Sequence, residues 1–308
     1  MPRFSIIIPV FNKEKFVAKT IKSVLSQTFS DFEIIVINDG STDKSEAEIL
    51  AIADERILYF SKKNEGVAVA RNLGIAKASA DYICFLDADD FWFPNFIETM
   101  NQYIQKLPNE KVFACAIEIE TNKKTFPAQY SINKKGDFEI VNFFEASQKE
   151  AVLWTSAVCI HKEVFKKTNV FDEQLTISED TDLWIRIGLN YPVVFIWQIL
   201  ARYVFDKKSI SRNLNYIFEV AFFEKYADKE RQNLALKKYM DLNRFSSVIK
   251  HNLNGDLKSG AKLYAEIDLK NLTKKKRILL KLSPILLKLL IGFQQFLVNI
   301  GIGNSVFK

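Results

Sequence analysis

Short apolar runs alternate with segments of helical hydrophobic spacing along the first part of the chain. The runs cover residues 4–11, 32–37, 57–60 and 82–86, and their length and composition are typical of strands buried in a parallel sheet. Between them, apolar side chains recur every three or four residues, as Val17, Ile21 and Val24 do, which indicates amphipathic helices. We therefore predict an α/β fold with a Rossmann-like, mostly parallel sheet flanked by helices.

The pattern changes in the second half of the chain. Residues 112–119 and 153–160 are predicted strands, whereas residues 120–150 are polar and predict no clear element. From Ile210 onward helical spacing predominates, so we expect a helical C-terminal extension. In the first strand, Pro9 should end the pairing because proline has no backbone N–H to donate.

Polar residues follow each of the first four predicted strands. Asn12 follows the first, Asp39 the second, Asn64 the third, and Asp87 and Asp89 the fourth. Ligands of open α/β sheets bind beyond the carboxyl ends of the strands, so these turns should converge on a crevice that can hold a nucleotide. Neither GxGxxG nor GxxxxGK[ST] occurs, which argues against a dinucleotide oxidoreductase and a P-loop NTPase.

The fourth strand ends in three carboxylates within four positions, Asp87, Asp89 and Asp90. Such grouping is unfavourable unless a cation shares the site. Mg²⁺ and Mn²⁺ prefer carboxylates together with phosphate oxygens, so we expect a metal–diphosphate site at Asp87 and Asp89. The alternative is an acidic turn that caps the next helix, for which Asp90 alone would suffice.

A second acidic group begins the predicted helix that follows Ser178. Glu179 and Asp180 stand in its first turn, before an apolar helix face with Leu183 and Ile187. Serine capping and acids in the first turn are ordinary helix-start chemistry. Glu179 and Asp180 would have a role beyond this helix start only if they are paired with the metal–diphosphate site.

Composition and charge narrow the class of protein. The chain has 308 residues, 48% of them hydrophobic, and a net charge of +6. Residues 269–308 carry eight basic residues and no acid, which leaves 35 basic and 37 acidic residues in the body. We therefore expect no nucleic-acid partner. No secretory signal or spanning helix of about 20 apolar residues is evident, and three separated cysteines suggest buried thiols in a reducing compartment.

Taken together, the sequence resembles the family 2 glycosyltransferases of the GT-A fold. Five segments in the family's order, spread over about the first 210 residues, carry the resemblance. They are SIIIPVFN at residues 5–12, VINDGSTD at 36–43, NEG at 64–66 with ARNLG at 70–74, FLDADD at 85–90, and ED at 179–180 with LWIR at 183–186.

On the donor side, the resemblance implies a nucleotide-sugar site. Asp39 resembles the carboxylate that accepts the N–H of the nucleotide base, next to the strand end at Pro9 and Phe11. Arg71 resembles the family's basic contact near the nucleotide. UDP is the family's usual carrier, so UDP is the nucleotide that this resemblance favours.

At the reaction centre, the resemblance implies a divalent metal and a general base. Asp87 and Asp89 resemble the DxD pair, with Asp89 as direct ligand of Mn²⁺ or Mg²⁺ and Asp87 nearer the ribose and metal. Asp180 resembles the catalytic base, and Glu179 would orient it or the acceptor.

One departure concerns residues 203–211, where family members often carry a histidine that can reach the metal. Asp206 stands at that position and Val204 replaces an arginine. Asp206 could ligate the metal, or it could be a surface residue on a loop that never closes. His161 and His251 match no ligand position, and we interpret both as structural.

The implied enzyme is an inverting hexosyl- or N-acetylhexosaminyltransferase. It would move a sugar to a hydroxyl of a glycan or lipid-linked acceptor in cell-surface polysaccharide synthesis. The alternatives are a catalytically silent sugar-nucleotide or glycan-binding module on the same fold, and a nucleotidyltransferase, whose usual glycine-rich basic N-terminal loop is absent.

The expected domains are a catalytic domain at 1–211, with a nucleotide-binding half at 1–106 and an acceptor half at 107–211, and a helical region at 212–308. Its tail, 272–300, combines a basic stripe with a wide apolar face and should be kinked at Pro284. We expect this tail to lie on the inner membrane surface, making the protein cytoplasmic and peripheral. The alternatives are docking on the core or on a partner.

Overall fold

The computed structural model describes residues 2–121, 124–204 and 217–299, and only the backbone of 293–299. The chain forms two compact units, Met1–Asp206 and Lys207–Lys308. The predicted domain boundary at 211/212 falls outside the described residues, and the predicted division at 106/107 stays a prediction.

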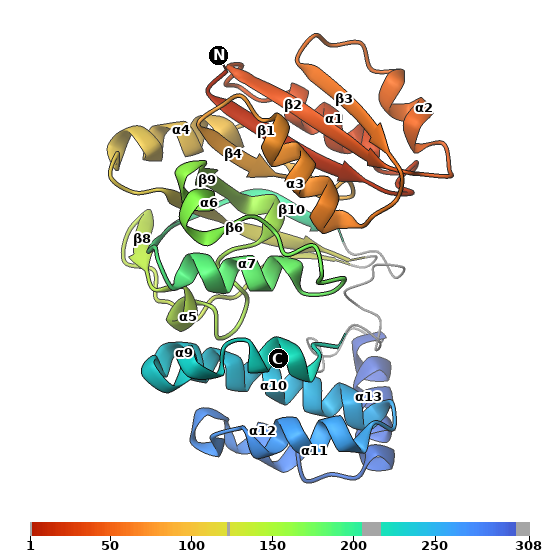
Figure 1. Ribbon diagram of the computed structural model, residues 1–308, viewed down its shortest axis with the longest axis vertical. Coiled ribbons are helices and arrows are strands. Elements are labelled where there is room, and N and C mark those ends of the chain that lie inside the picture. Colours follow the sequence, from red (N-terminus) through yellow and green to blue (C-terminus); the bar gives the residue numbers. More distant parts are fainter. Residues whose placement is uncertain (1, 122–123, 205–216, 300–308) are drawn as a thin grey trace. The chain divides into compact units, whose positions relative to one another are not determined.

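The first unit is built on one ten-stranded sheet with the order β3-β2-β1-β4-β9-β6-β10-β5, in which β7 pairs with β6 and β8 with β10 (Figure 1). β1 to β4 are parallel, as are β6 and β10, whereas β9 runs antiparallel between β4 and β6. The α/β fold is therefore confirmed. The strands are β1 Phe4–Val10, β2 Phe32–Asp39, β3 Ile57–Lys62, β4 Tyr82–Phe85, β5 Phe91–Trp92, β6 Val112–Glu120, β7 Thr125–Pro127, β8 Phe138–Val141, β9 Val158–His161 and β10 Val193–Val204.

Helices cover both faces of this sheet. α1 and α4 share one apolar core with Ile6 and Ile8 of β1. On the other face α3 packs so closely on β1 that a Cβ on Gly74 would lie 2.4 Å from Cγ2 of Ile7. The helices are α1 Val17–Leu25, α2 Ser45–Leu50, α3 Val67–Lys77, α4 Phe96–Lys106, α5 Phe143–Ala146, α6 Glu163–Thr168 and α7 Glu179–Gly188.

Two sequence-based strand predictions need correction. Pro9 does not end the pairing of β1, because it lies in register with Ile37 of β2 and the strand continues to Val10. On the other side of β1, the pairing with β4 already ends at Ile7. Pro9 therefore has no partner in β4 whose hydrogen bonds its missing N–H could interrupt. The predicted strand 153–160 is half right, since a 3₁₀ turn at Thr155–Ala157 precedes β9.

The second unit is helical, as expected, with α8 Val220–Glu224, α9 Ala227–Gln232, α10 Leu234–Leu253, α11 Leu257–Ala265, a 3₁₀ turn Leu269–Asn271, α12 Lys274–Leu279 and α13 Pro284–Asn299. Arg244 of α10 donates from both terminal nitrogens to Glu230 at 2.7 Å, and all three charged residues of this cluster, with Asp241, are buried. The cluster ties α9 to α10 inside the unit.

Pro284 begins α13 instead of kinking a longer helix, which corrects the prediction. The first turn of a helix tolerates proline because the missing N–H would have no helical partner there. The thiols of Cys84, Cys115 and Cys159 are buried and free. No helix in the described part of the chain is long and apolar enough to cross a membrane.

Candidate active site

The carboxyl ends of β1, β2 and β4 place the predicted donor-site residues at one edge of the sheet. Asp39, the last residue of β2, is buried, and it accepts hydrogen bonds from the backbone N–H groups of Glu65 and Gly66 at 3.1 and 2.9 Å. Its Oδ1 also forms an ion pair with Lys62 Nζ at 2.5 Å. The turn after β3 is therefore fastened to the end of β2 by a fixed carboxylate.

The turn after β1 links the turn after β2 to the acidic turn after β4. Asn12 adopts a left-handed backbone with φ of 53°, and its side-chain oxygen accepts from the N–H of Thr42 at 2.8 Å. The next residue, Lys13, donates from its backbone to Ser45 and forms an ion pair from Nζ to Asp89 Oδ2 at 2.5 Å. Lys13 was not among the predicted site residues, although its place in a polar turn at the sheet edge was visible in the sequence.

In the acidic turn, each of the three carboxylates has a different partner. Asp87 is bound by Arg71 Nη2 at 2.7 Å, and Asp89 by Lys13. Asp90 is buried and accepts from Ser156 Oγ at 2.5 Å and from the N–H of Val204 at 3.1 Å. Burial, with the charges of Asp87 and Asp89, raises the pKa of Asp90 well above its usual range.

Asp90 therefore joins the end of β4 to the end of β10. Ser156 also accepts a hydrogen bond from the N–H of Asp87 at 3.1 Å, so one hydroxyl contacts both ends of the turn. The alternative that Asp90 caps the next helix does not describe this geometry, because the Asp90 carboxylate accepts its hydrogen bonds from Ser156 and Val204. Sequence reasoning missed Ser156, whose neighbours offer no motif.

Arg71 connects the two acidic motifs. Its guanidinium is buried and donates from Nη2 to Asp87 and from Nη1 to Glu179 Oε1 at 2.8 Å. Burial alone would lower the pKa of Arg71, but the negative charges of Asp87, Glu179 and Asp180 raise it by more. The net effect is a raised pKa, so the guanidinium stays cationic. Arg71 Nε is buried and has no hydrogen-bond partner among the described residues.

Glu179 and Asp180 open α7 as acidic residues of its first turn. Ser178 has a left-handed backbone with φ of 68° and its side chain does not cap the helix. Glu179 points to Arg71, while Asp180 Oδ1 accepts from its neighbour Thr181 N at 2.5 Å. Burial and the charge of Asp180 raise the pKa of Glu179 to about 7. Burial also raises the pKa of Asp180, against the opposing charge of Arg71.

The loop that leads into α7 is fastened to α3 next to Arg71. Asn72 accepts from the N–H of Phe171 at 3.0 Å and donates back to the carbonyl of Phe171 at 2.9 Å. The ring of Phe171 lies 5.2 Å from the Arg71 guanidinium carbon. Arg71 and Asn72, consecutive residues of α3, thus hold Glu179 and the loop that leads into α7.

Among the described residues, no group of three or more acidic, histidine or cysteine side chains could hold a metal ion. Asp206 lies outside the described residues. Two carboxylates nevertheless suit Mg²⁺ or Mn²⁺, which are usually held by one or two carboxylates plus the phosphates of a substrate. Asp87 and Asp89 therefore fit such an ion with a diphosphate, provided that Lys13 yields Asp89 Oδ2.

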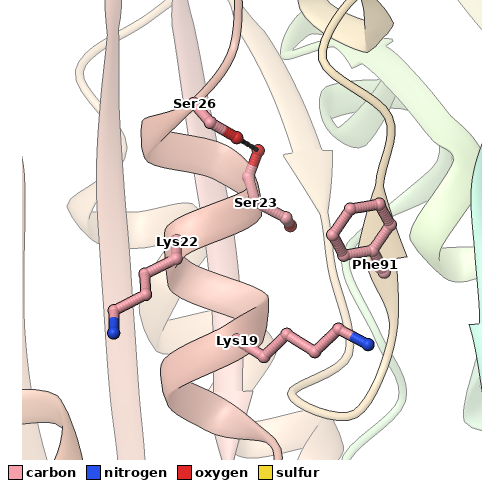
Figure 2. A pocket seen from close by; sticks show the side chains of 5 residues that line it. All are labelled: Lys19, Lys22, Ser23, Ser26 and Phe91. Carbon is pink, nitrogen blue, oxygen red and sulfur yellow. Dashed lines mark hydrogen bonds between the residues drawn. The ribbon is translucent and has the colours of Figure 1, made fainter.

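A surface hollow of about 430 Å³ between α1 and β5 includes none of the predicted site residues. It is lined by Lys19, Lys22, Ser23, Ser26 and Phe91. Figure 2 shows Lys19 extending toward the ring of Phe91, 5.5 Å away, and Lys22 pointing in another direction. Its open, lysine-rich wall offers no convergent set of groups, so it is not the candidate site.

The fold is shared with S. aureus TarS. The crystal structure of TarS 1-349 in complex with UDP-GlcNAc superimposes with a TM-score of 0.62 at 17% identity, over 87% of this chain and 89% of that chain. The shared fold is of the GT-A type. A family model describes the chain more closely: glycosyl transferase family 2 matches residues 5–168, and the chain belongs to that family.

Curated relatives of this chain are also named glycosyltransferases. An uncharacterized glycosyltransferase of Rickettsia typhi is 33% identical over 225 residues, which cover 71% of this chain and 69% of the relative. Another, from Rickettsia conorii, is 37% identical over 194 residues, but the chain spans only 30% of its length. Glu179 and Asp180 lie beyond the residues 5–168 that the family model matches.

Proposed function

We propose that this protein is an inverting glycosyltransferase that moves a hexosyl or N-acetylhexosaminyl group from a UDP-linked sugar to a hydroxyl of a glycan or lipid-linked acceptor, in cell-surface polysaccharide synthesis. The single observation that carries the proposal is the guanidinium of Arg71, which bridges Asp87 and Glu179. It brings the acidic turn after β4 to the acidic start of α7.

On the donor side, Asp39 would accept the N–H of the base beside Pro9 and Phe11. Its carboxylate is already oriented by two backbone N–H groups and Lys62, and Phe11 is 44% exposed at the strand end. Arg71 would be the basic contact near the nucleotide. The choice of UDP is supported by analogy with TarS, which has been crystallised with UDP and with UDP-GlcNAc.

Asp87 and Asp89 would hold a divalent ion, Mn²⁺ or Mg²⁺, together with the donor's diphosphate. When bound, such an ion supplies Lewis-acid stabilisation of the charge on the leaving diphosphate. Lys13 and Arg71 already place two cations against the same carboxylates. The site would therefore offer positive charge where the leaving group becomes more negative.

Asp180 would take the proton of the acceptor hydroxyl as that oxygen attacks the anomeric carbon from the face opposite the diphosphate. Attack from that side inverts the anomeric centre, as in inverting glycosidases with the acceptor in place of water. A carboxyl with a raised pKa is a stronger base than an ordinary aspartate, and burial raises the pKa of Asp180. Glu179, held by Arg71, would orient Asp180 or the acceptor.

The test compares wild-type protein with Asp180→Asn. We expect sugar transfer to fall by about 10²–10⁴, the usual contribution of a general base, while UDP still raises the melting temperature. Metal-dependent turnover of UDP-GlcNAc by the wild type would discard the silent binding module, and unchanged transfer by Asp180→Asn would remove Asp180 from the mechanism.

We also propose that the segment 272–300 binds an anionic membrane surface, which would hold a lipid-linked acceptor near the enzyme. Lys274, Lys275 and Lys281 are exposed, and α13 leaves Ile285 and Leu289 72% and 64% exposed. Apolar side chains beside lysines suit a helix lying in the interface of a membrane.

A further inference from the structure

Two aromatic side chains lie together beside the acidic turn. The rings of Trp154 and Tyr203 have centroids 5.1 Å apart in an edge-to-face arrangement with an interplanar angle of 66°. Both rings pack against the main apolar core, and both are partly exposed. A partly exposed pair supported by a core is a rigid apolar surface that already has its shape before any ligand arrives.

Hydrogen bonds tie this pair to the acidic turn from both sides. Ser156, two residues after Trp154, donates to Asp90 and accepts from the N–H of Asp87. Val204, the residue after Tyr203, donates from its backbone to Asp90. The two aromatic residues are therefore placed at the reaction edge by the same buried carboxyl that fixes the acidic turn.

The pair lies on the side of the acidic turn that is remote from the nucleotide. Tyr203 is the next-to-last residue of β10, which β9 and β6 separate from β4, whereas Asp39 ends β2 on the opposite side of β4. A group that contacts Trp154 and Tyr203 is therefore on the acceptor side. Pyranose rings present an apolar face of C–H groups, and that face packs on aromatic rings while the hydroxyls keep their hydrogen bonds.

We propose that Trp154 and Tyr203 form the binding surface for the pyranose ring of a glycan acceptor. This inference rests on the proposed function, because an acceptor sugar is useful there only if a donor binds beyond Asp87. It adds the chemical class of the group that carries the attacking hydroxyl: a sugar ring with an apolar face.

The experiment measures binding of three simple glycosides by saturation-transfer NMR with UDP and Mg²⁺ present. The probes are methyl β-D-glucopyranoside, methyl β-D-galactopyranoside and methyl N-acetyl-β-D-glucosaminide. We expect the wild type to bind at least one of them, and Trp154→Leu and Tyr203→Leu to weaken it about 3- to 10-fold, the usual value of an aromatic contact. Trp154→Phe keeps a ring and should lose less than Trp154→Leu.

Trp197→Leu is the matched control. Trp197 is another partly exposed tryptophan of β10, and its ring contacts are to Phe195 and Tyr130. It should leave glycoside binding unchanged. The melting temperature with UDP reports folding and the donor site in every variant, and turnover of UDP-GlcNAc without acceptor should stay the same in Trp197→Leu.

The outcomes separate the two proposals. If UDP stabilises the wild type but none of the glycosides binds, or Trp154→Leu binds as tightly as wild type, the acceptor surface is overturned and the proposed function stands. If UDP, GDP and dTDP all fail to bind the wild type, the proposed function is overturned and this inference with it.

Discussion

At the scale of single residues, the site depends on the two ion pairs that Arg71 forms. One buried guanidinium compensates a carboxylate on the β4 turn and another at the start of α7. A buried charge is costly unless it is paired and hydrogen-bonded. Arg71 is therefore a structural requirement of the site as well as a candidate donor contact.

Removing Arg71 should destabilise the protein by about 3–5 kcal/mol, since the partner left behind is a buried, unpaired Glu179. Arg71→Met keeps the volume and removes the charge. The double variant Arg71→Met with Glu179→Gln should recover part of that loss, and urea unfolding of both single and double variants gives the coupling free energy. Additive single effects would contradict the bridge.

The raised pKa of Glu179 makes stability depend on pH. Its pKa rises from 4.5 to about 7 in the folded protein, so the folded state binds the proton more tightly than the unfolded chain. Stability is therefore lost as pH rises from about 4.5 to 7. Glu179→Gln should reduce this slope, which unfolding free energies measured at pH 5, 6, 7 and 8 would reveal, while Asp90 and Asp180, whose pKa values are also raised, keep the remainder. An equal slope in both proteins would place the titration elsewhere.

Lys13 should compete with a divalent ion for Asp89. Its Nζ is 2.5 Å from Asp89 Oδ2, so a metal that uses this oxygen must displace a charge-assisted hydrogen bond. Without nucleotide, Lys13→Met should bind Mn²⁺ about tenfold more tightly, equivalent to about 1.4 kcal/mol, as measured by electron paramagnetic resonance. Lys22→Met, in the hollow on α1, is the control. Unchanged or weaker Mn²⁺ binding by Lys13→Met would contradict the competition.

Much of the candidate site was predictable because polar turns after parallel strands share one edge. Asp39 is the last residue of β2, and Asp87 and Asp89 follow β4, and the apolar runs of both strands were plain in the sequence. Ser156 and Lys62 were not predictable, since their roles depend on which strands become neighbours in the sheet. β9 enters the sheet antiparallel, and no local pattern specifies that.

At the scale of elements, the same contrast separates the two halves of the first unit. β1 to β4 are continuous apolar runs and were predicted within a few residues. β7, β8 and α5 are short elements in the polar segment 120–150, and their apolar positions are too few to show a period. β7 and β8 are stabilised by pairing with β6 and β10, respectively. β8 and β10 are distant in the sequence, so no local pattern predicts their pairing.

The contact of α3 with β1 gives a prediction for Gly74. A Cβ there would lie 2.4 Å from Cγ2 of Ile7, and Ile7 is fully buried, so the side chain has little room to move. Gly74→Ala should destabilise the unit by about 1–3 kcal/mol through overpacking, as measured by urea unfolding. Gly292→Ala, where a Cβ would contact nothing within 4 Å, should be neutral or stabilising. Equal effects of the two would refute the close approach.

At the scale of the whole molecule, the charge is divided between the two units. The eight basic residues at 269–308 account for more than the net charge of +6. Within the second unit, α13 packs on α10 and buries Leu287, while Ile285, Leu286, Leu289 and Leu290 remain 46–72% exposed. Exposed apolar side chains concentrated on one helix indicate a binding surface.

The membrane proposal predicts that these exposed side chains are required for binding to an anionic membrane. Ile285→Gln with Leu289→Gln should reduce co-sedimentation with phosphatidylglycerol vesicles more than tenfold, because two large apolar side chains no longer enter the interface. Lys281→Glu with Lys288→Glu should also reduce binding, and salt should weaken binding of the wild type. Both pairs are exposed, so folding should be unaffected, which helical circular dichroism would check. Wild-type protein that stays in the supernatant, or that binds no better than a variant lacking residues 272–308, would instead assign the apolar face to another protein surface.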